Sequence, residues 1–410
     1  MHCVVWRCER AIGAGQSGGV EVARAAKSAA VFPTAFRCAL IATLVACSSS
    51  GSYGQGAPAH ATRSNHWPGG HYRPFSRESV FNQRLPRDIQ TAEIDPNSEA
   101  EVAQILAYGG LAPLNIAADP GATDYTYPYY FASASDPAYQ IRCTAAYGGT
   151  AHPHACSVAS RPIHIPVGAL PENSGGTREA SDHHLAIVDE AAGMEYDFWG
   201  AEVPSGKGGP LTISWGGEGP LEGNGITGFG ATHADISLRI GVVRPADLLA
   251  GEIPHALQFA TYCAGTQAVR SGVFPFAAII SDFPCPNDTA GAPLYGTRLW
   301  LDLSDTEIAA LHVPRYLRVM YTALAHYGAF LSDAIGCQCP SLFPAEGGLT
   351  YTAMGAPNPW AEVAARDAIP AVGLPAHRRY SFPMNPPAEA GLDLAAHLHV
   401  LAPCVTQKTC

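Results

Sequence analysis

Two acidic residues and a tryptophan alternate along a short segment near the middle of the chain. Glu195, Asp197 and Trp199 are separated by single residues, and the residues between them are aromatic. Successive side chains of a strand point to opposite faces, so these three are predicted to share one face. Carboxylates that bind hydroxyls and an indole that stacks on a ring are typical of sugar-binding grooves. The segment therefore predicts one wall of a carbohydrate site.

The two acids also suggest hydrolysis of a glycosidic bond. That reaction needs one protonated and one ionised carboxyl group, about 5 Å apart for retention and about 6.5–9.5 Å apart for inversion. The spacing of Glu195 and Asp197 puts their Cα atoms about 6.5–7 Å apart. We predict a glycoside hydrolase in which Asp197 acts with Glu195 or Asp182, assisted by His184. The competing interpretation is a solvated strand face that carries two charges.

A polysaccharide lyase is the alternative enzyme. Elimination needs a base, often histidine or tyrosine, and a group that neutralises the uronate carboxylate, often arginine. Residues of these types are His184, His255, Tyr196 and Arg244. Each histidine also has a structural interpretation, at a strand edge or within the core. A non-catalytic surface lipoprotein that binds glycan or has a structural role is the third class.

The predicted substrate contacts come from several segments. They are Trp199, Trp215, Tyr196, Arg244, His233 and Tyr327. Together with the hairpin around residues 181–201, the segment Thr232–His255 would form the second wall. We expect no cofactor and no metal, because three converging ligands with a fixed spacing such as HExxH are missing from the sequence. A Gly-x-Ser-x-Gly motif is also missing, which disfavours a serine hydrolase.

The composition predicts a turn-rich, β-dominated protein. The 410 residues include 42 glycines and 34 prolines, and 14% are charged. The alternating pattern predicts a hairpin from His184 to Trp199, and residues 231–243 also look β-like. We expect a mainly β fold, a β-sandwich or jelly roll, with a few peripheral helices. The net charge of −11 and the absence of a basic run disfavour nucleic acid as a partner.

The N-terminal region has the features of an export signal. Arg37 precedes the apolar residues 38–46, a run too short to span a membrane. Leu44 to Cys47, followed by serines, resembles a bacterial lipobox, which implies lipidation of Cys47; the alternative is an ordinary secretory signal. Residues 1–46 are thus predicted as the export signal, with an over-long start, residues 47–72 as a tether, and 73–410 as a single β-rich domain. We expect an outer-membrane lipoprotein or an extracellular protein, attached to the membrane only by its lipid, with a polysaccharide or oligosaccharide as its partner.

Eight cysteines follow the predicted lipidation site, and an even set in an oxidising compartment predicts disulfides. Nearness in sequence suggests Cys143–Cys156 and Cys263–Cys285. The other four are predicted to pair across the C-terminal region without a defined partner: Cys337, Cys339, Cys404 and Cys410.

Several stretches resemble an uncharacterised family of secreted bacterial proteins from actinobacteria and soil bacteria. The stretches are Ser79–Pro86 (SVFNQRLP), Asp182–Ala201, Gly230–Arg244 (GATHADISLRIGVVR), Gly251–Phe259 (GEIPHALQF), Ala325–Gly328 (AHYG) and Gly355–Trp360 (GAPNPW). The resemblance extends over most of residues 75–370 and implies no particular activity. The positions that it marks are Asp182, His184, Tyr196, Asp197, Arg244, His255 and Tyr327.

Three positions depart from this family. Asp197 stands where the family has glutamate, and Pro254 stands where it has aspartate. His233 occupies a position associated with a small residue. The shorter Asp197 still permits acid chemistry, with a reach that is less by about one methylene.

Overall fold

The computed structural model describes residues 73–119, 122, 124–144, 156, 158, 161–174, 182–226, 230–265, 272–276 and 291–410. The predicted export signal, the tether, Cys47 and Cys285 lie outside these residues. Within the described ranges, no helix combines the length and apolar character needed to cross a membrane.

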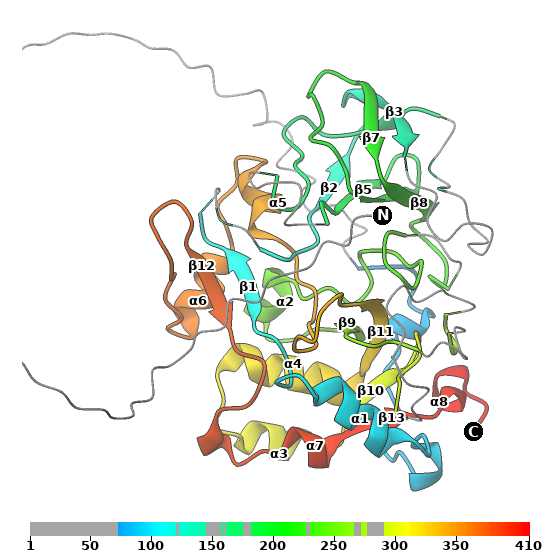
Figure 1. Cartoon of the computed structure of the whole chain (residues 1–410), viewed down its shortest axis with the longest axis vertical. Coiled ribbons are helices and arrows are strands. Elements are labelled where there is room, and N and C mark those ends of the chain that lie inside the picture. The colour runs from blue at the N-terminus through cyan, green and yellow to red at the C-terminus, as the bar shows by residue number, and fades with distance from the viewer. Residues whose placement is uncertain are drawn as a thin grey trace, which may run out of the picture. The chain divides into compact units, whose positions relative to one another are not determined.

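The predicted hairpin forms the middle of a four-stranded sheet, here called the β6 sheet. Figure 1 labels β2, β5 and β8 of this sheet. Its order is β2 (Tyr129–Ala132), β5 (Leu185–Asp189), β6 (Met194–Trp199) and β8 (Trp215–Pro220). β5 and β6 pair antiparallel from Leu185↔Phe198 to Asp189↔Met194. β2 and β5 are parallel, whereas β6 and β8 are antiparallel. The hairpin prediction is therefore confirmed.

A second four-stranded sheet, here called the β9 sheet, belongs to the C-terminal half. Its order is β13 (Leu398–Leu401), β10 (Arg298–Leu301), β11 (Ala329–Ala334) and β9 (Leu257–Thr261). β9 and β11 are parallel, so their carboxyl ends lie at the same edge. The two smaller sheets comprise β4 (Ile163–His164), β3 (Ala138–Cys143) and β7 (Gly209–Ile213), and β1 (Leu114–Ala117) with β12 (Arg379–Phe382).

The helices are mostly short. They are α1 (Ser98–Leu106), α2 (Pro245–Ala250), α3 (Asp305–Ala310), α4 (Arg315–His326), α5 (Gly348–Thr352), α6 (Trp360–Arg366), α7 (Leu394–His397) and α8 (Pro403–Gln407), with 3₁₀ turns η3 (Val80–Asn82), η4 (Thr91–Glu93) and η7 (Ala388–Ala390). Pro314, the N-cap of α4, lies between α3 and α4. The mainly β fold with few helices is confirmed, in four antiparallel or mixed sheets. A sandwich or jelly-roll arrangement stays a prediction.

Residues 230–243, here called the central segment, differ from the prediction. They are buried almost throughout, but they form turns instead of a strand. Leu238 and Val242 pack with aromatic residues that precede or lie in β2, whereas Ile236 and Ile240 belong to the core that includes β9 and β11. A Cβ on Gly241, whose φ is +64°, would lie 2.2 Å from the Gln258 nitrogen. Both sides of the segment are covered by apolar clusters, so its apolar run resembles that of a buried strand although its backbone forms turns.

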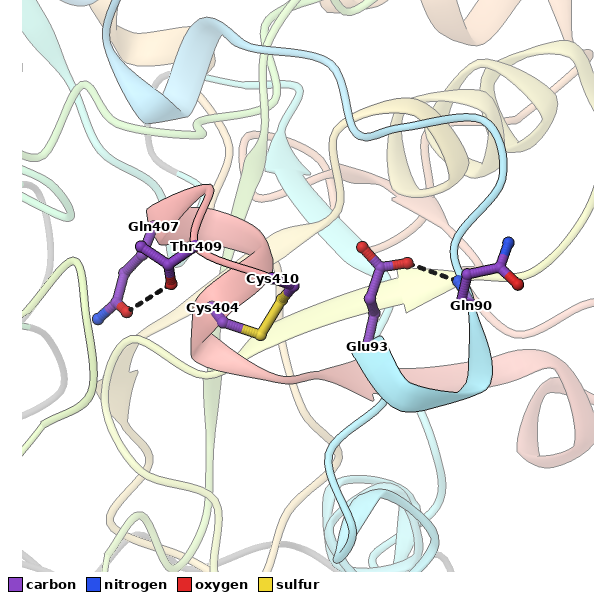
Figure 2. Close-up of a disulfide and its surroundings, with 6 residues drawn as sticks. All are labelled: Gln90, Glu93, Cys404, Gln407, Thr409 and Cys410. Atoms are coloured by element: carbon purple, nitrogen blue, oxygen red, sulfur yellow. Dashed lines mark hydrogen bonds between the residues drawn. A yellow bond between two sulfur atoms is a disulfide. The ribbon is translucent and has the colours of Figure 1, made fainter.

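The disulfides join cysteines that are close in sequence. Cys143 bonds to Cys156 as predicted, and Cys263 is disulfide-bonded as well. The expected pairing across the C-terminal region is wrong, because the pairs there are local: Cys337–Cys339 and Cys404–Cys410. Figure 2 shows the latter pair at α8, near the η4 turn.

Candidate functional site

The two acids of β6 share one strand face, as expected, and that face is covered by the central segment. Both side chains are completely buried. Glu195 accepts hydrogen bonds from the Ser237 hydroxyl at 2.6 Å and from Arg239 Nε at 2.7 Å. Asp197 Oδ2 accepts the Leu238 backbone N–H at 2.8 Å. Because the central segment is not in a sheet ladder, these carboxylates supply acceptors for its buried polar groups.

Asp197 and Glu195 differ in their electrostatic surroundings. Burial, together with the negative charge of Glu195, raises the pKa of Asp197 well above its usual value. Arg239, which is 3% exposed, lies against Glu195 and favours its ionised form. The geometry thus places Asp197, whose pKa is raised, beside the ion pair between Glu195 and Arg239.

The raised pKa of Asp197 makes the free energy of unfolding depend on pH, and Asp197→Asn should remove this dependence. A raised pKa means that the folded state binds an extra proton, so the stabilisation is complete below about pH 3.9 and decreases as pH rises through the folded-state pKa. Asparagine is neutral at every pH, and its amide oxygen can still accept the Leu238 N–H. In urea denaturation across a pH series, the variant should gain stability relative to the wild type as pH rises. If the free energies of unfolding of the wild type and the variant changed in parallel with pH, the raised pKa of Asp197 would be contradicted.

His184, directly before β5, is 1% exposed and has a polar partner at each ring nitrogen. Its Nδ1 is 3.3 Å from Glu172 Oε2, and its Nε2 is 3.3 Å from the Ala231 carbonyl oxygen. Burial by itself lowers the pKa of His184, but the hydrogen bond to Glu172 and the charges of Asp182 and Glu172 raise it above its usual value. His184 therefore connects the hairpin to the start of the central segment.

His233, in the central segment, is paired with Asp333 at the end of β11. Its Nδ1 is 2.5 Å from Asp333 Oδ1, which also accepts the backbone N–H of His233 at 3.1 Å. Burial raises the pKa of Asp333, but the positive charge and hydrogen bonds of His233 lower it below its usual value. The His233 side chain is 26% exposed, so the pair joins a partly accessible imidazole to an ionised carboxylate.

Tyr127 links the two histidines. Its hydroxyl donates to Asp333 Oδ2 at 3.3 Å, and its ring lies edge-on to the His184 ring with centroids 4.8 Å apart. The ring of Tyr295 lies parallel to His233, at 6.5 Å between centroids. These contacts bring Tyr127 and the two histidines together near Asp333. This group, His184, Glu172, Tyr127, Asp333 and His233, is the candidate functional site.

Other predicted site residues lie in separate groups. His255 is 1% exposed, 3.5 Å from Asp247 through Nε2, and Arg244 binds the same carboxylate at 2.7 and 3.0 Å. Their burial and mutual pairing form an internal charge cluster at α2. Tyr196 points to the other face of β6 and accepts a hydrogen bond from Arg161 at 3.1 Å.

The two tryptophans are aligned across β6 and β8, at register Trp199↔Trp215. Trp215 is 7% exposed, and Trp199 packs beside the cluster of Tyr127 and Leu238. Tyr327 caps α4 and accepts a hydrogen bond from Arg84 at 3.2 Å. Asp182 precedes the hairpin, and its carbonyl accepts the Gly200 N–H at 2.8 Å. A role in substrate contact stays a prediction for all of them.

Three members of the candidate site were missed in the sequence: Glu172, Tyr127 and Asp333. Asp333 offered one signal, a carboxylate at the carboxyl end of an apolar strand. Among the described residues, no group of three histidine, cysteine or acidic side chains could hold a metal ion. No protein-family model, curated protein or solved structure matches the chain.

Proposed function

We propose that this chain acts on an extracellular polysaccharide and that it is a lyase with His233 as its base. The pairing of His233 with Asp333 is the observation that carries this proposal. A carboxylate on Nδ1 fixes the imidazole in one orientation and stabilises its protonated form. Nε2 is then the nitrogen that takes the proton. The partial exposure of His233 favours it over the more deeply buried His184.

The reaction that fits this pair is elimination at a uronate. His233 would remove the proton from the carbon next to the sugar carboxylate, and the glycosidic oxygen would leave with the electron pair as a double bond forms. The leaving oxygen takes up a proton from solvent water, and His233 later releases its proton to solvent, so a new chain end and an unsaturated uronate result. Asp333 stabilises the imidazolium that forms on His233 during this step.

Hydrolysis by the β6 carboxylates has less geometric support. Glu195 and Asp197 are both completely buried and are engaged with the central segment. A glycosidase needs both carboxyl groups within reach of one bond. Elimination is therefore favoured over hydrolysis among the proposed reactions. The predicted export signal and lipid anchor would place either reaction outside the cell.

The test is incubation of the purified full chain with polygalacturonate, alginate, hyaluronan and the neutral polymers xylan and cellulose. Elimination predicts ultraviolet absorbance from the unsaturated uronate, only with the acidic polymers. New reducing ends without that absorbance would show hydrolysis and overturn the lyase. Binding to any polymer without product would favour the surface glycan-binding protein.

A further inference from the structure

The nitrogens of His184 indicate its charge. Nδ1 faces a carboxylate oxygen of Glu172 and Nε2 faces the Ala231 carbonyl, and both of these partners are acceptors. A neutral imidazole has one N–H, so it can satisfy only one of the two. At 1% exposure, the second nitrogen would leave a buried lone pair facing an acceptor. When Glu172 is a carboxylate, only the imidazolium donates to both.

A buried cation requires compensating charge, and this site provides it. Glu172, from the loop before the hairpin, has a completely buried side chain against His184. The Glu172 backbone N–H also donates to the His184 carbonyl at 2.9 Å, which holds the two residues together. Asp182 and Asp333 add negative charge from the preceding residues and from β11. Among the residues that the structure describes, the ionisable groups that face His184 are Glu172, Asp182, Asp333 and the Tyr127 phenol.

His184 contacts both parts of the proposed base, one through Nε2 and the other through the ring of Tyr127. Nε2 anchors Ala231, two residues before His233 in the central segment. Tyr127 packs its ring on His184 and donates its hydroxyl to Asp333, and the positive charge of His184 favours the ionised form of Asp333. Loss of that charge would affect the position of His233 and the charge of its partner together.

We propose that His184 is a positioning residue for the elimination reaction: a buried imidazolium that anchors the segment carrying His233 and stabilises the Asp333 carboxylate from behind. This inference rests on the proposed function for its catalytic consequence. The charge of His184 itself follows from the contacts alone.

The direct test is an NMR titration of the histidine imidazoles in the intact protein. We expect His184 to remain doubly protonated above the ordinary histidine pKa of about 6.5. In Glu172→Gln its titration should move to lower pH, because the neutral amide no longer favours the cation. A neutral His184 at about pH 7, or a titration unaffected by Glu172→Gln, would overturn the inference.

The kinetic test uses His184→Gln and Tyr127→Phe with polygalacturonate, alginate and hyaluronan. Misplacement of a catalytic group can cost up to about 100-fold, so kcat should fall by about that factor in His184→Gln, with KM little changed. The wild type should lose activity as pH rises through the His184 titration measured by NMR, whereas His184→Gln should lack that alkaline decrease. His399→Gln on β13, which changes a partly exposed histidine, is the matched control and should retain the wild-type profile.

The failures of the two proposals are distinguishable. If His233→Ala retains full activity, the proposed base is wrong, while the His184 titration can still be measured in that variant. If His233→Ala is inactive but His184→Gln keeps the wild-type rate and pH profile, only the positioning role is overturned. If His184→Gln does not fold, the titrations of the wild type and Glu172→Gln decide the charge, and Tyr127→Phe decides the coupling to Asp333.

Discussion

Replacing His233 with alanine should lower kcat/KM for polysaccharide elimination by about 10²- to 10⁴-fold, which is the usual contribution of a general base. Asp333→Asn should produce a loss of similar size, because the amide cannot stabilise the imidazolium and can present an N–H to Nδ1 where the carboxylate accepts. The Asp333 carboxylate also accepts the N–H groups of His233 and Ala334 at 3.1 and 2.9 Å. The measurement is the initial rate of unsaturated product formation on whichever uronate polymer the wild type cleaves.

The matched control for this prediction is His326→Ala. His326 pairs with Asp305 at 2.6 Å near the surface, so it reproduces a histidine–aspartate contact outside the candidate site. It should retain the wild-type rate. Wild-type kcat/KM in a folded His233→Ala protein would exclude His233 as the base, and with it the proposed lyase mechanism.

Removing the Glu195 carboxylate should destabilise the fold by about 3–5 kcal/mol, the usual cost of breaking a buried ion pair by deleting one partner. In Glu195→Ala, the Arg239 guanidinium would remain 3% exposed without its carboxylate, and the Ser237 hydroxyl would lose its acceptor. Urea denaturation of the purified protein measures the loss in the free energy of unfolding.

Two comparisons separate this effect from the loss of side-chain volume. The double variant Glu195→Ala/Arg239→Met should recover part of the stability, because the guanidinium that lost the Glu195 carboxylate is no longer in the core. Glu202→Ala, at an exposed position just after β6, should change the free energy of unfolding by less than about 0.5 kcal/mol. A loss below about 1 kcal/mol in Glu195→Ala would mean that water or another group compensates Arg239, against the buried pair described above.

The local parts of the fold could be predicted from the sequence. The hairpin followed from a period of two, which depends only on neighbouring residues. The Cys143–Cys156 disulfide followed from nearness. The central segment could not be predicted in the same way, since its apolar residues face two cores and its irregular backbone is satisfied by Asp197, 41 residues away from Leu238.

The candidate site also depends on contacts between residues that are distant in sequence. The shared face of Glu195 and Asp197 was predictable, but alternation does not reveal what covers a face, and here the cover removes both acids from solvent. His233 and Asp333 are 100 residues apart, and Tyr127 is 206 residues from Asp333. Such contacts depend on how the two larger sheets come together around one segment, which no local pattern records. Asp333 lies near the carboxyl end of β11, at the same end of the sheet as the carboxyl end of β9, because the two strands are parallel.

The turns of the central segment have a consequence for how the chain moves. A segment without strand-to-strand hydrogen bonds would ordinarily open easily. In the central segment, however, the backbone N–H of His233 donates to Asp333, that of Ala234 to Ser332 and that of Leu238 to Asp197. These amide protons should exchange with solvent deuterium as slowly as those of β5 and β6, because releasing them requires the two sheets to separate. Proteases and insertions should therefore avoid this stretch, although it has the outline of a loop.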